Sequence, residues 1–347
     1  MPGPMSRVCE VTPMHLDDPA LLFLLASRDP SIRFFALTDL LDRPHGDSEV
    51  ASLKELISEG PKIKSLMAGQ KGAMRKSPKS LASHEGGFGV HPYKKWDGAH
   101  WRLVSAVELG IPADYPGVRS AADQVLGWLA GESHRKGIRK IRGLTRRCGS
   151  QEGNALAVCC RLGLINDPRV HLLARSLVEW QWPDGGWNCD VDESAHHSSF
   201  YETLPPLWGL TEYYRLTGDD DVLRAVDRAS DFFLRHRLYR AEETGKVINA
   251  EWLKLHYPLY WRYDILQALV VLGRAGKLGD PRAEEALGLL EQKRQADGCW
   301  HVEGRFWEHV GRRPSNVDVV DWGRSGPNEM ITLNALRVFK VAGRWPV

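Results

Sequence analysis

The chain has 347 residues, of which 43% are apolar and 26% are charged, and its formal net charge is +2. This composition predicts a soluble globular protein with one large domain or two small ones, and the near balance of charge disfavours nucleic acid as a partner. No apolar run approaches the roughly 20 residues that a membrane-spanning helix needs. Six cysteines without a disulfide-framework spacing, and no signal-peptide pattern over residues 1–9, predict a cytoplasmic protein.

Helical signals begin near the N-terminus and continue to the end of the chain. Residues 17–43 predict two short helices, because Asp18-Pro19 and Asp29-Pro30 each place a capping acid before a proline. We assign residues 1–47 to an N-terminal helical extension and residues 48–347 to the main domain. No run has a polar–apolar period of two, so the predicted fold class is all-α. The helices predicted for the main domain span residues 48–70, 98–109, 116–129, 150–162, 167–182, 198–216, 219–238, 257–272, 280–294 and 327–342.

An internal repeat organises the main domain. The segment Gln181–Trp187 (Gln-Trp-Pro-Asp-Gly-Gly-Trp) returns as Gln295–Trp300, and each copy follows an Asp-Pro-Arg at the same distance. The helices also alternate between amphipathic ones and ones that are apolar all round, as expected for an outer and an inner ring. A repeat of this kind buries its faces on its neighbours, which predicts an α/α toroid of about five to six helical hairpins.

The repeated motif resembles a known one. Gln181–Trp187 matches the Gln-Trp motif of squalene-hopene-type terpene cyclases and is similar to the glycine–aromatic loops of protein prenyltransferase β-subunits. Residues 48–342 look like one α/α toroid of that superfamily. The resemblance implies that the motif staples an outer helix to the next turn of the ring and takes no part in the chemistry. Asp184 is then a helix cap and Trp187 a packing residue.

The connectors from outer to inner helices are long and rich in charged, aromatic and metal-binding residues. They include two basic runs, 62–79 and 134–147, and they lead to the N-termini of the inner helices, where unpaired N–H groups favour anions. We therefore expect an aromatic-lined central cavity with a cationic mouth, which binds a small, partly apolar molecule carrying an anionic group. The expected substrate-binding residues are Lys95, Trp96, His100, Trp101, Glu152, Tyr257, Trp322, Arg324 and Asn328.

Three chemistries fit these connectors. In the first, Asp190–Glu193 resembles the Asp-x-Asp-Asp acid motif of class II terpene cyclases, which implies that Asp192 protonates an alkene. In the second, zinc is the candidate cofactor of a transferase or hydrolase, with Cys148, Cys189 and His196 as ligands. This follows protein prenyltransferases, in which Asp, Cys and His bind zinc, although their Asp-x-Cys-Tyr spacing is absent here.

In the third, metal-free acid–base chemistry pairs His197 with Glu202, and Tyr257 or Tyr260 with Arg324. Our leading hypothesis is a cyclase, isomerase or lyase, and a non-catalytic binding scaffold is a further alternative. Substrate identity and oligomeric state stay open. The candidate catalytic residues are His197, Glu202, Asp192, His256, Tyr260 and Asp264.

Overall fold

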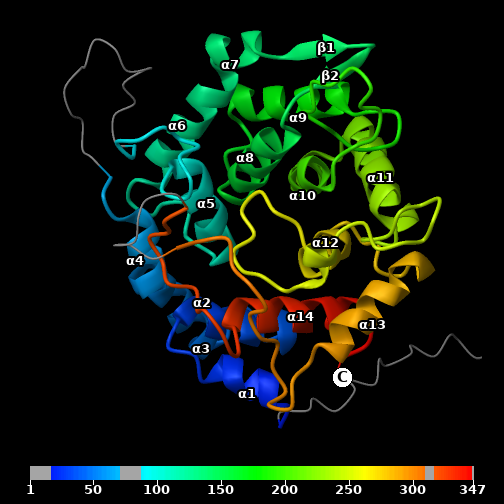
Figure 1. Cartoon of the computed structure of the whole chain (residues 1–347). Coiled ribbons are helices and arrows are strands. Elements are labelled where there is room, and N and C mark those ends of the chain that lie inside the picture. Colours follow the sequence, from blue (N-terminus) through cyan, green and yellow to red (C-terminus); the bar gives the residue numbers. More distant parts are fainter. Residues whose placement is uncertain (1–16, 71–86, 309–315, 346–347) are drawn as a thin grey trace, which may run out of the picture.

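The computed structural model describes residues 17–70, 87–308 and 316–345. Over these residues the protein is mostly helical (Figure 1), which agrees with the all-α prediction. The first nine residues and the basic side chains of Lys71, Arg75, Lys76 and Lys79 lie outside the described residues. None of the described helices could span a lipid bilayer, since none combines the required length with sufficient hydrophobicity.

The N-terminal helices pack against the last helix of the chain. Helix α1 (Pro19–Leu25), α2 (Pro30–Phe35) and the π-helical turn η1 (Ala36–Leu40) all contact α14 (Glu329–Val341). As the sequence predicts, Asp18 and Asp29 cap the first two helices. Arg337 of α14 donates to Asp39 at 2.8 Å and so connects the two ends of the chain.

Two kinds of helix alternate along the rest of the chain. Helices α5 (Ala99–Glu108), α8 (Gly149–Arg161), α10 (Phe200–Thr217), α12 (Ile265–Arg274) and α14 are buried on most of their surface. The amphipathic helices α6 (Val118–Ala130), α9 (Pro168–Trp180), α11 (Asp220–Arg235) and α13 (Glu284–Gln292) bury one face. Each inner helix contacts the next one in chain order, and α12 contacts α14. Figure 1 shows the segment before α12, drawn in yellow, running through the space between the inner helices.

Two predicted helices differ from the observed ones. The helix expected over residues 48–70 is divided into α3 (Ser48–Leu56), the 3₁₀ turn η2 (Ile57–Glu59) and α4 (Pro61–Met67), because Pro61 has no N–H to continue the ladder. The helix expected over 257–272 begins only at Ile265, where the Asp264 carboxylate caps the amide of Gln267 at 2.8 Å. Short 3₁₀ turns η3 (Ala250–Leu253) and η4 (Pro281–Ala283) complete the connectors.

A small antiparallel hairpin lies in the basic connector 134–147, where no strand was expected. After helix α7 (Glu132–Lys136), strands β1 (Arg139–Ile141) and β2 (Leu144–Arg146) pair with each other. The two turn residues Arg142 and Gly143 both have positive φ, 49° and 80°, as a two-residue hairpin turn with right-handed strand twist requires. Three-residue strands are too short for their period to be visible in the sequence.

The two copies of the repeated motif make equivalent hydrogen bonds. The Trp187 indole donates to the carbonyl of Leu177 at 2.9 Å, and the Trp300 indole donates to that of Leu290 at 2.7 Å. Their backbone amides donate at 3.1 Å to threonine hydroxyls of α10 and α14, respectively. Both indoles are buried, so each copy fastens an outer helix to the following inner helix. The observed bonds confirm the internal repeat.

Glycines bring α8 and α10 unusually close together. A Cβ atom on Gly153 would lie 2.3 Å from the backbone nitrogen of Pro206, and one on Gly209 would lie 2.3 Å from the carbonyl oxygen of Gly153. The two backbones therefore touch where any side chain would separate them. This contact sets the distance between the N-terminal ends of the two helices.

Candidate functional site

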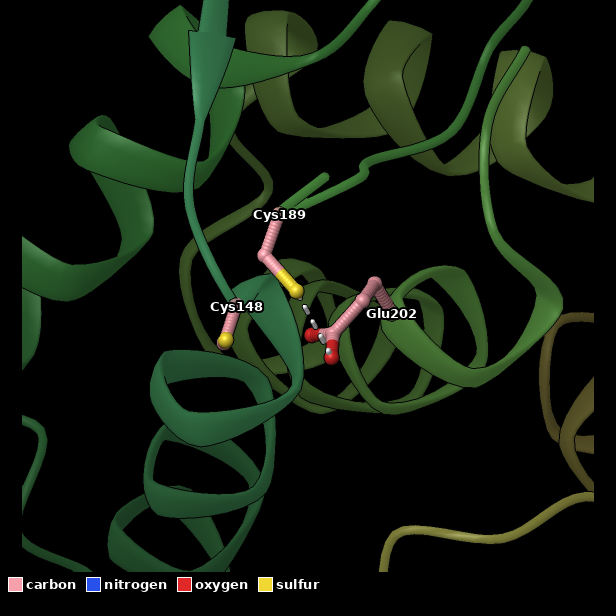
Figure 2. Close-up of side chains that lie close together, drawn as sticks. All are labelled: Cys148, Cys189 and Glu202. Carbon is pink, nitrogen blue, oxygen red and sulfur yellow. Dashed lines mark hydrogen bonds between the residues drawn. The ribbon is translucent and has the colours of Figure 1, made fainter. Parts of the chain in front are cut away.

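Two cysteines and a glutamate, from two connectors and the first turn of α10, meet at the N-terminal ends of α8 and α10. One ligand atom from each of Cys148, Cys189 and Glu202 lies within 4.8 Å of the other two. Figure 2 shows the Cys189 sulfur pointing at the Glu202 carboxylate, with Cys148 beside them at the start of α8. All three side chains are partly exposed, so solvent reaches the cluster.

Local structure explains why these residues meet. Cys148 is the N-cap residue of α8, and Glu202 lies in the first turn of α10. The amide of Arg147 donates to the carbonyl of Asn188 at 3.1 Å, which holds the residues that precede Cys148 and Cys189 side by side. The repeated motif thus positions Cys189 through the segment that follows Trp187.

One carboxylate oxygen of Glu202, Oε2, is held by a backbone amide of α8. The amide of Ser150 donates to Glu202 Oε2 at 3.0 Å, and the Cys189 thiol donates to Oε1 at 3.7 Å. Burial raises the pKa of Glu202, although the hydrogen bonds from Ser150 oppose this change. The carboxylate therefore lies in a setting that disfavours an uncompensated negative charge.

The two thiols interact with each other. A hydrogen bond from the Cys148 thiol lowers the pKa of Cys189, while the same contact, together with burial, raises the pKa of Cys148. One thiolate is therefore easier to form here than two. A cation between the three groups would relieve the mutual repulsion of their charged forms and deprotonate both thiols.

The donor set fits zinc. Two sulfurs and one carboxylate oxygen are ligands that zinc prefers, at about 2.3 Å and 2.0–2.2 Å, respectively. Tetrahedral angles then require ligand atoms to be about 3.5–3.8 Å apart. The 3.7 Å between Cys189 Sγ and Glu202 Oε1 meets this requirement, and the Cys148 ligand atom lies within 4.8 Å of both. A catalytic zinc has three protein ligands and one position for water or substrate.

The two exposed histidines among the candidates do not join this cluster. His196 donates from Nδ1 to the carbonyl of Ser194 at 2.6 Å, its ring lies 4.0 Å from that of His197 at a tilt of 47°, and both histidines are exposed. The expected zinc ligand His196 and the expected pair of His197 with Glu202 are therefore corrected. Both histidines lie in the solvated loop before α10, where no packed neighbour turns them inward.

The acid-motif prediction is corrected as well. Asp192 is exposed, and its carboxylate accepts bonds from the hydroxyl and amide of Ser194 at 2.7 and 2.8 Å. These bonds lower its pKa, so the group stays ionised at neutral pH and has no proton to donate. Arg324 is exposed too, in the connector before α14, while Tyr257 is buried.

Several expected substrate-binding residues are packed among aromatic neighbours, and two of them, Lys95 and Trp96, line a cavity of about 220 Å³. Trp96 stacks on Tyr260 with ring centroids 3.8 Å apart, and Trp101 lies edge-on to Trp96. Lys95 is exposed and lies 5.0 Å from the ring centroid of Trp261. These residues form one aromatic cluster at the mouth where the inner helices begin.

The other predicted residues are engaged in internal bonds. Glu152 pairs with His134 at 3.0 Å and with Arg147 at 3.2 Å. Asn328 caps α14 and binds the carbonyl of Trp322, whose indole in turn donates to Asp318. No sequence signal indicated His134, which lies 18 residues before its partner Glu152.

His256 and Asp264 are buried together beneath Phe306. The Asp264 carboxylate accepts the amide of His256 at 3.0 Å, and burial raises the pKa of Asp264 to about 7. Burial lowers the pKa of His256, whose ring stacks on Phe306. Both side chains support the entry into α12, and neither lines a cavity among the described residues.

The centre between the inner helices is largely filled. Tyr257 donates to Glu108 at 3.1 Å, and Tyr257, Tyr260 and Trp208 leave a cavity of only about 50 Å³. Ligand pockets measure about 300–1,000 Å³. The segment that precedes α12 thus occupies the space where a large central cavity was expected. In the sequence, this segment is part of the helix predicted over residues 257–272.

Replacing His100 with phenylalanine is expected to reduce the loss of stability in acid. The imidazole is 2% exposed, neither nitrogen has a hydrogen-bond partner among the described residues, and burial lowers its pKa from 6.5 to about 3. As pH falls from 6.5 towards 3, the unfolded chain binds a proton that the folded chain does not. Stability then falls by about 1.4 kcal/mol per pH unit.

Urea unfolding near pH 7.5 and pH 5 measures this effect. Between the two pH values, the His100→Phe variant should lose about 2 kcal/mol less than the parent protein. The same loss in both proteins would show that His100 titrates normally in the folded state.

Two comparisons with known proteins identified no relative of this chain. No protein-family model matches the chain, and no curated protein matches its sequence.

Proposed function

We propose that the protein is a zinc-dependent enzyme, a transferase or hydrolase, whose metal is held by Cys148, Cys189 and Glu202. The observation that carries this proposal is the convergence of three ligand atoms within 4.8 Å of one another. Two of the three were expected as metal ligands from the sequence. The third, Glu202, was expected as an acid–base residue and takes a ligand's place here.

We further propose that the helices form an α/α toroid of six hairpins. The contacts between successive inner helices, and those of α1, α2 and η1 with α14, support a closed ring. In this arrangement the N-terminal helices are the hairpin that closes the ring, not an extension to it. The similarity to terpene cyclases and protein prenyltransferases then concerns the architecture.

Each residue of the proposed zinc site has its own role. When bound, zinc would lower the pKa of a water or thiol at the fourth position to near neutral pH. Cys148 and Cys189 supply thiolates, and Ser150 holds Glu202 in place through its amide. Arg147, next to Cys148, favours the thiolate form of that cysteine electrostatically. Since each ligand is partly exposed, a substrate can reach the site from solvent.

Metal analysis tests the proposal directly. After exposure to micromolar zinc and removal of the excess, the purified chain should contain about one zinc per molecule. The Cys189→Ser variant should contain less than about a tenth of that amount, because a two-ligand site binds zinc weakly. Cys299→Ala is the matched control, since Cys299 is buried in the second copy of the repeat, outside the cluster.

Cobalt provides an independent measurement. A cobalt-loaded protein should show sulfur-to-metal charge-transfer absorption that the Cys189→Ser variant lacks. A parent protein without zinc and without this absorption would contradict the proposed site. Zinc that is retained equally in the Cys189→Ser variant would place the metal elsewhere.

A further inference from the structure

A larger cavity lies at the opposite ends of the inner helices. It measures about 660 Å³ and is lined by the C-terminal ends of α5, α8, α10, α12 and α14 together with η1. Arg161 and Arg215, which lie in the last turns of α8 and α10, line it. Cys148 caps the other end of α8, so the two sites are about 20 Å apart along that helix.

Basic side chains predominate in this cavity. Among the described residues that line it, five carry a positive charge (Arg161, Arg215, Arg274, Arg337 and Lys340) and three are acidic (Asp39, Asp42 and Glu108). One basic residue at each helix C-terminus has a structural explanation, because it offsets the helix dipole. That effect does not require the five cations to face one shared space.

Four of the five cations have carboxylate partners. Arg337 pairs with Asp39 and Lys340 pairs with Asp42, both at 2.6 Å. Arg161 and Arg215 share Glu212, at 3.5 and 3.7 Å, respectively. The remaining acidic group on the wall, Glu108, accepts the hydroxyl of Tyr257.

Arg274 is the cation without a carboxylate partner among the described ion pairs. Its Nη1 has no hydrogen-bond acceptor and no access to solvent. The guanidinium packs 5.3 Å from the ring centroid of Trp208. Burial, followed by repulsion from Arg161, lowers the pKa of Arg274 to about 10. A buried donor without an acceptor is costly to a folded protein. Because Arg274 lines the cavity, a rotation of its guanidinium would turn Nη1 toward an anion there, which would supply the acceptor.

Apart from Thr38, His45 and Gly273, the rest of the lining is apolar. Phe34, Phe35, Leu269, Val270, Val338 and Val341 all face the same space. Its volume lies within the range of small-molecule sites, which combine an apolar wall with a few convergent polar groups. A simple inorganic anion would leave this apolar surface without contact.

We propose that this cavity binds a small amphiphilic anion, with a carboxylate or phosphate head group on Arg274 and Arg161 and an apolar body against the phenylalanine and valine side chains. This site is independent of the proposed zinc enzyme, and it lies at the end of the inner helices opposite to the basic connectors. A guanidinium pair suits both head groups because each offers paired oxygen acceptors.

Calorimetric titration with defined probes tests the proposal. Octyl phosphate and octanoate are the probes, and their relative affinities distinguish a phosphate from a carboxylate head group. Inorganic phosphate and octanol, which lack the apolar body and the charge, respectively, should each bind at least 10-fold more weakly. The Arg274→Met variant should bind the better probe at least 10-fold more weakly, whereas Arg224→Met, on the exposed face of α11, should bind it as the parent does.

A stability measurement separates binding from a structural role. Because Arg274 has an unsatisfied buried donor, the Arg274→Met variant should unfold without ligand at the same temperature as the parent, or at a higher one. Octanol that binds as tightly as octyl phosphate, or unchanged affinity in Arg274→Met, would overturn the anion site. Inorganic phosphate that binds as tightly as octyl phosphate would overturn the amphiphile assignment.

Discussion

Gly153→Ala is expected to destabilise the protein by about 3 kcal/mol or more, at the upper end of the range for overpacked cores. The new methyl group would lie 2.3 Å from the nitrogen of Pro206 and 2.4 Å from the carbonyl carbon of Pro205. These are backbone atoms, so no rotamer change relieves the clash, and α8 and α10 have to separate. Urea unfolding measures the loss.

Gly288→Ala is the matched control for this substitution. Gly288 also lies inside a helix, α13, but a Cβ atom there would have no neighbour within 4 Å. Alanine should stabilise that helix by up to about 1 kcal/mol, because glycine has the lower helix propensity. Equal effects at the two positions would show that the close approach of α8 and α10 is not required.

Gly153→Ala should also weaken metal binding. Cys148 and Ser150 lie at the start of α8, while Glu202 lies at the start of α10. Separating the two helices lengthens the bond from the Ser150 amide to Glu202 and moves one ligand away from the other two. At a temperature where the Gly153→Ala variant is still folded, its zinc affinity should fall at least 10-fold. Unchanged affinity would show that the connectors alone position the ligands.

Trp187→Ala is expected to destabilise the protein by about 3–5 kcal/mol, the range for removing a buried tryptophan. The substitution removes a side chain that is 1% exposed and also the indole hydrogen bond to Leu177. Trp300→Ala should have a similar effect, because Trp300 makes the same bonds two hairpins later. Thermal and urea unfolding measure whether Trp187→Ala and Trp300→Ala lose similar free energies of unfolding.

Phenylalanine at the same positions separates packing from hydrogen bonding. Trp187→Phe keeps an aromatic ring but loses the indole donor, so it should cost clearly less than the alanine variant. Zinc content also distinguishes the two copies of the motif. It should fall in Trp187→Ala but not in Trp300→Ala, because only Trp187 lies beside a metal ligand, Cys189. A Trp187→Ala variant as stable as the parent would contradict the stapling role of the motif.

Much of the helical pattern could be predicted because its signals are local. An aspartate before a proline marks the start of α1, α2 and α9, where the carboxylate accepts a backbone amide within three residues. The amphipathic period of the outer helices is likewise contained in about two turns of chain. The segment before α12 could not be predicted in the same way, because the apolar side chains of residues 257–263 fill the middle of the fold and are equally consistent with a helix.

The candidate site was predictable in part. The sequence indicated that Cys148, Cys189 and Glu202 lie near the starts of inner helices at one face. His196 and His197 lie in the same region and can also bind a metal or transfer a proton, so residue type alone does not separate them from the cluster. Only the packing of α8 on α10 and the bond between Arg147 and Asn188 decide which side chains converge. The two histidines stay exposed to solvent, although Arg146 of the β-hairpin donates to the carbonyl of Ala195 in the same loop at 2.8 Å.

By itself, therefore, the sequence determined the helical class, the repeat and the places where helices begin, since caps, prolines and amphipathic periods act over a few residues. The tertiary structure decided which groups meet. Cys148 and Glu202 converge across 54 residues of chain, and Arg161 and Arg274 line one cavity across 113, because helix packing brings together positions that no local signal relates. The basic residues at successive inner-helix ends were present in the sequence, but only the common direction of those helices gives them a shared space.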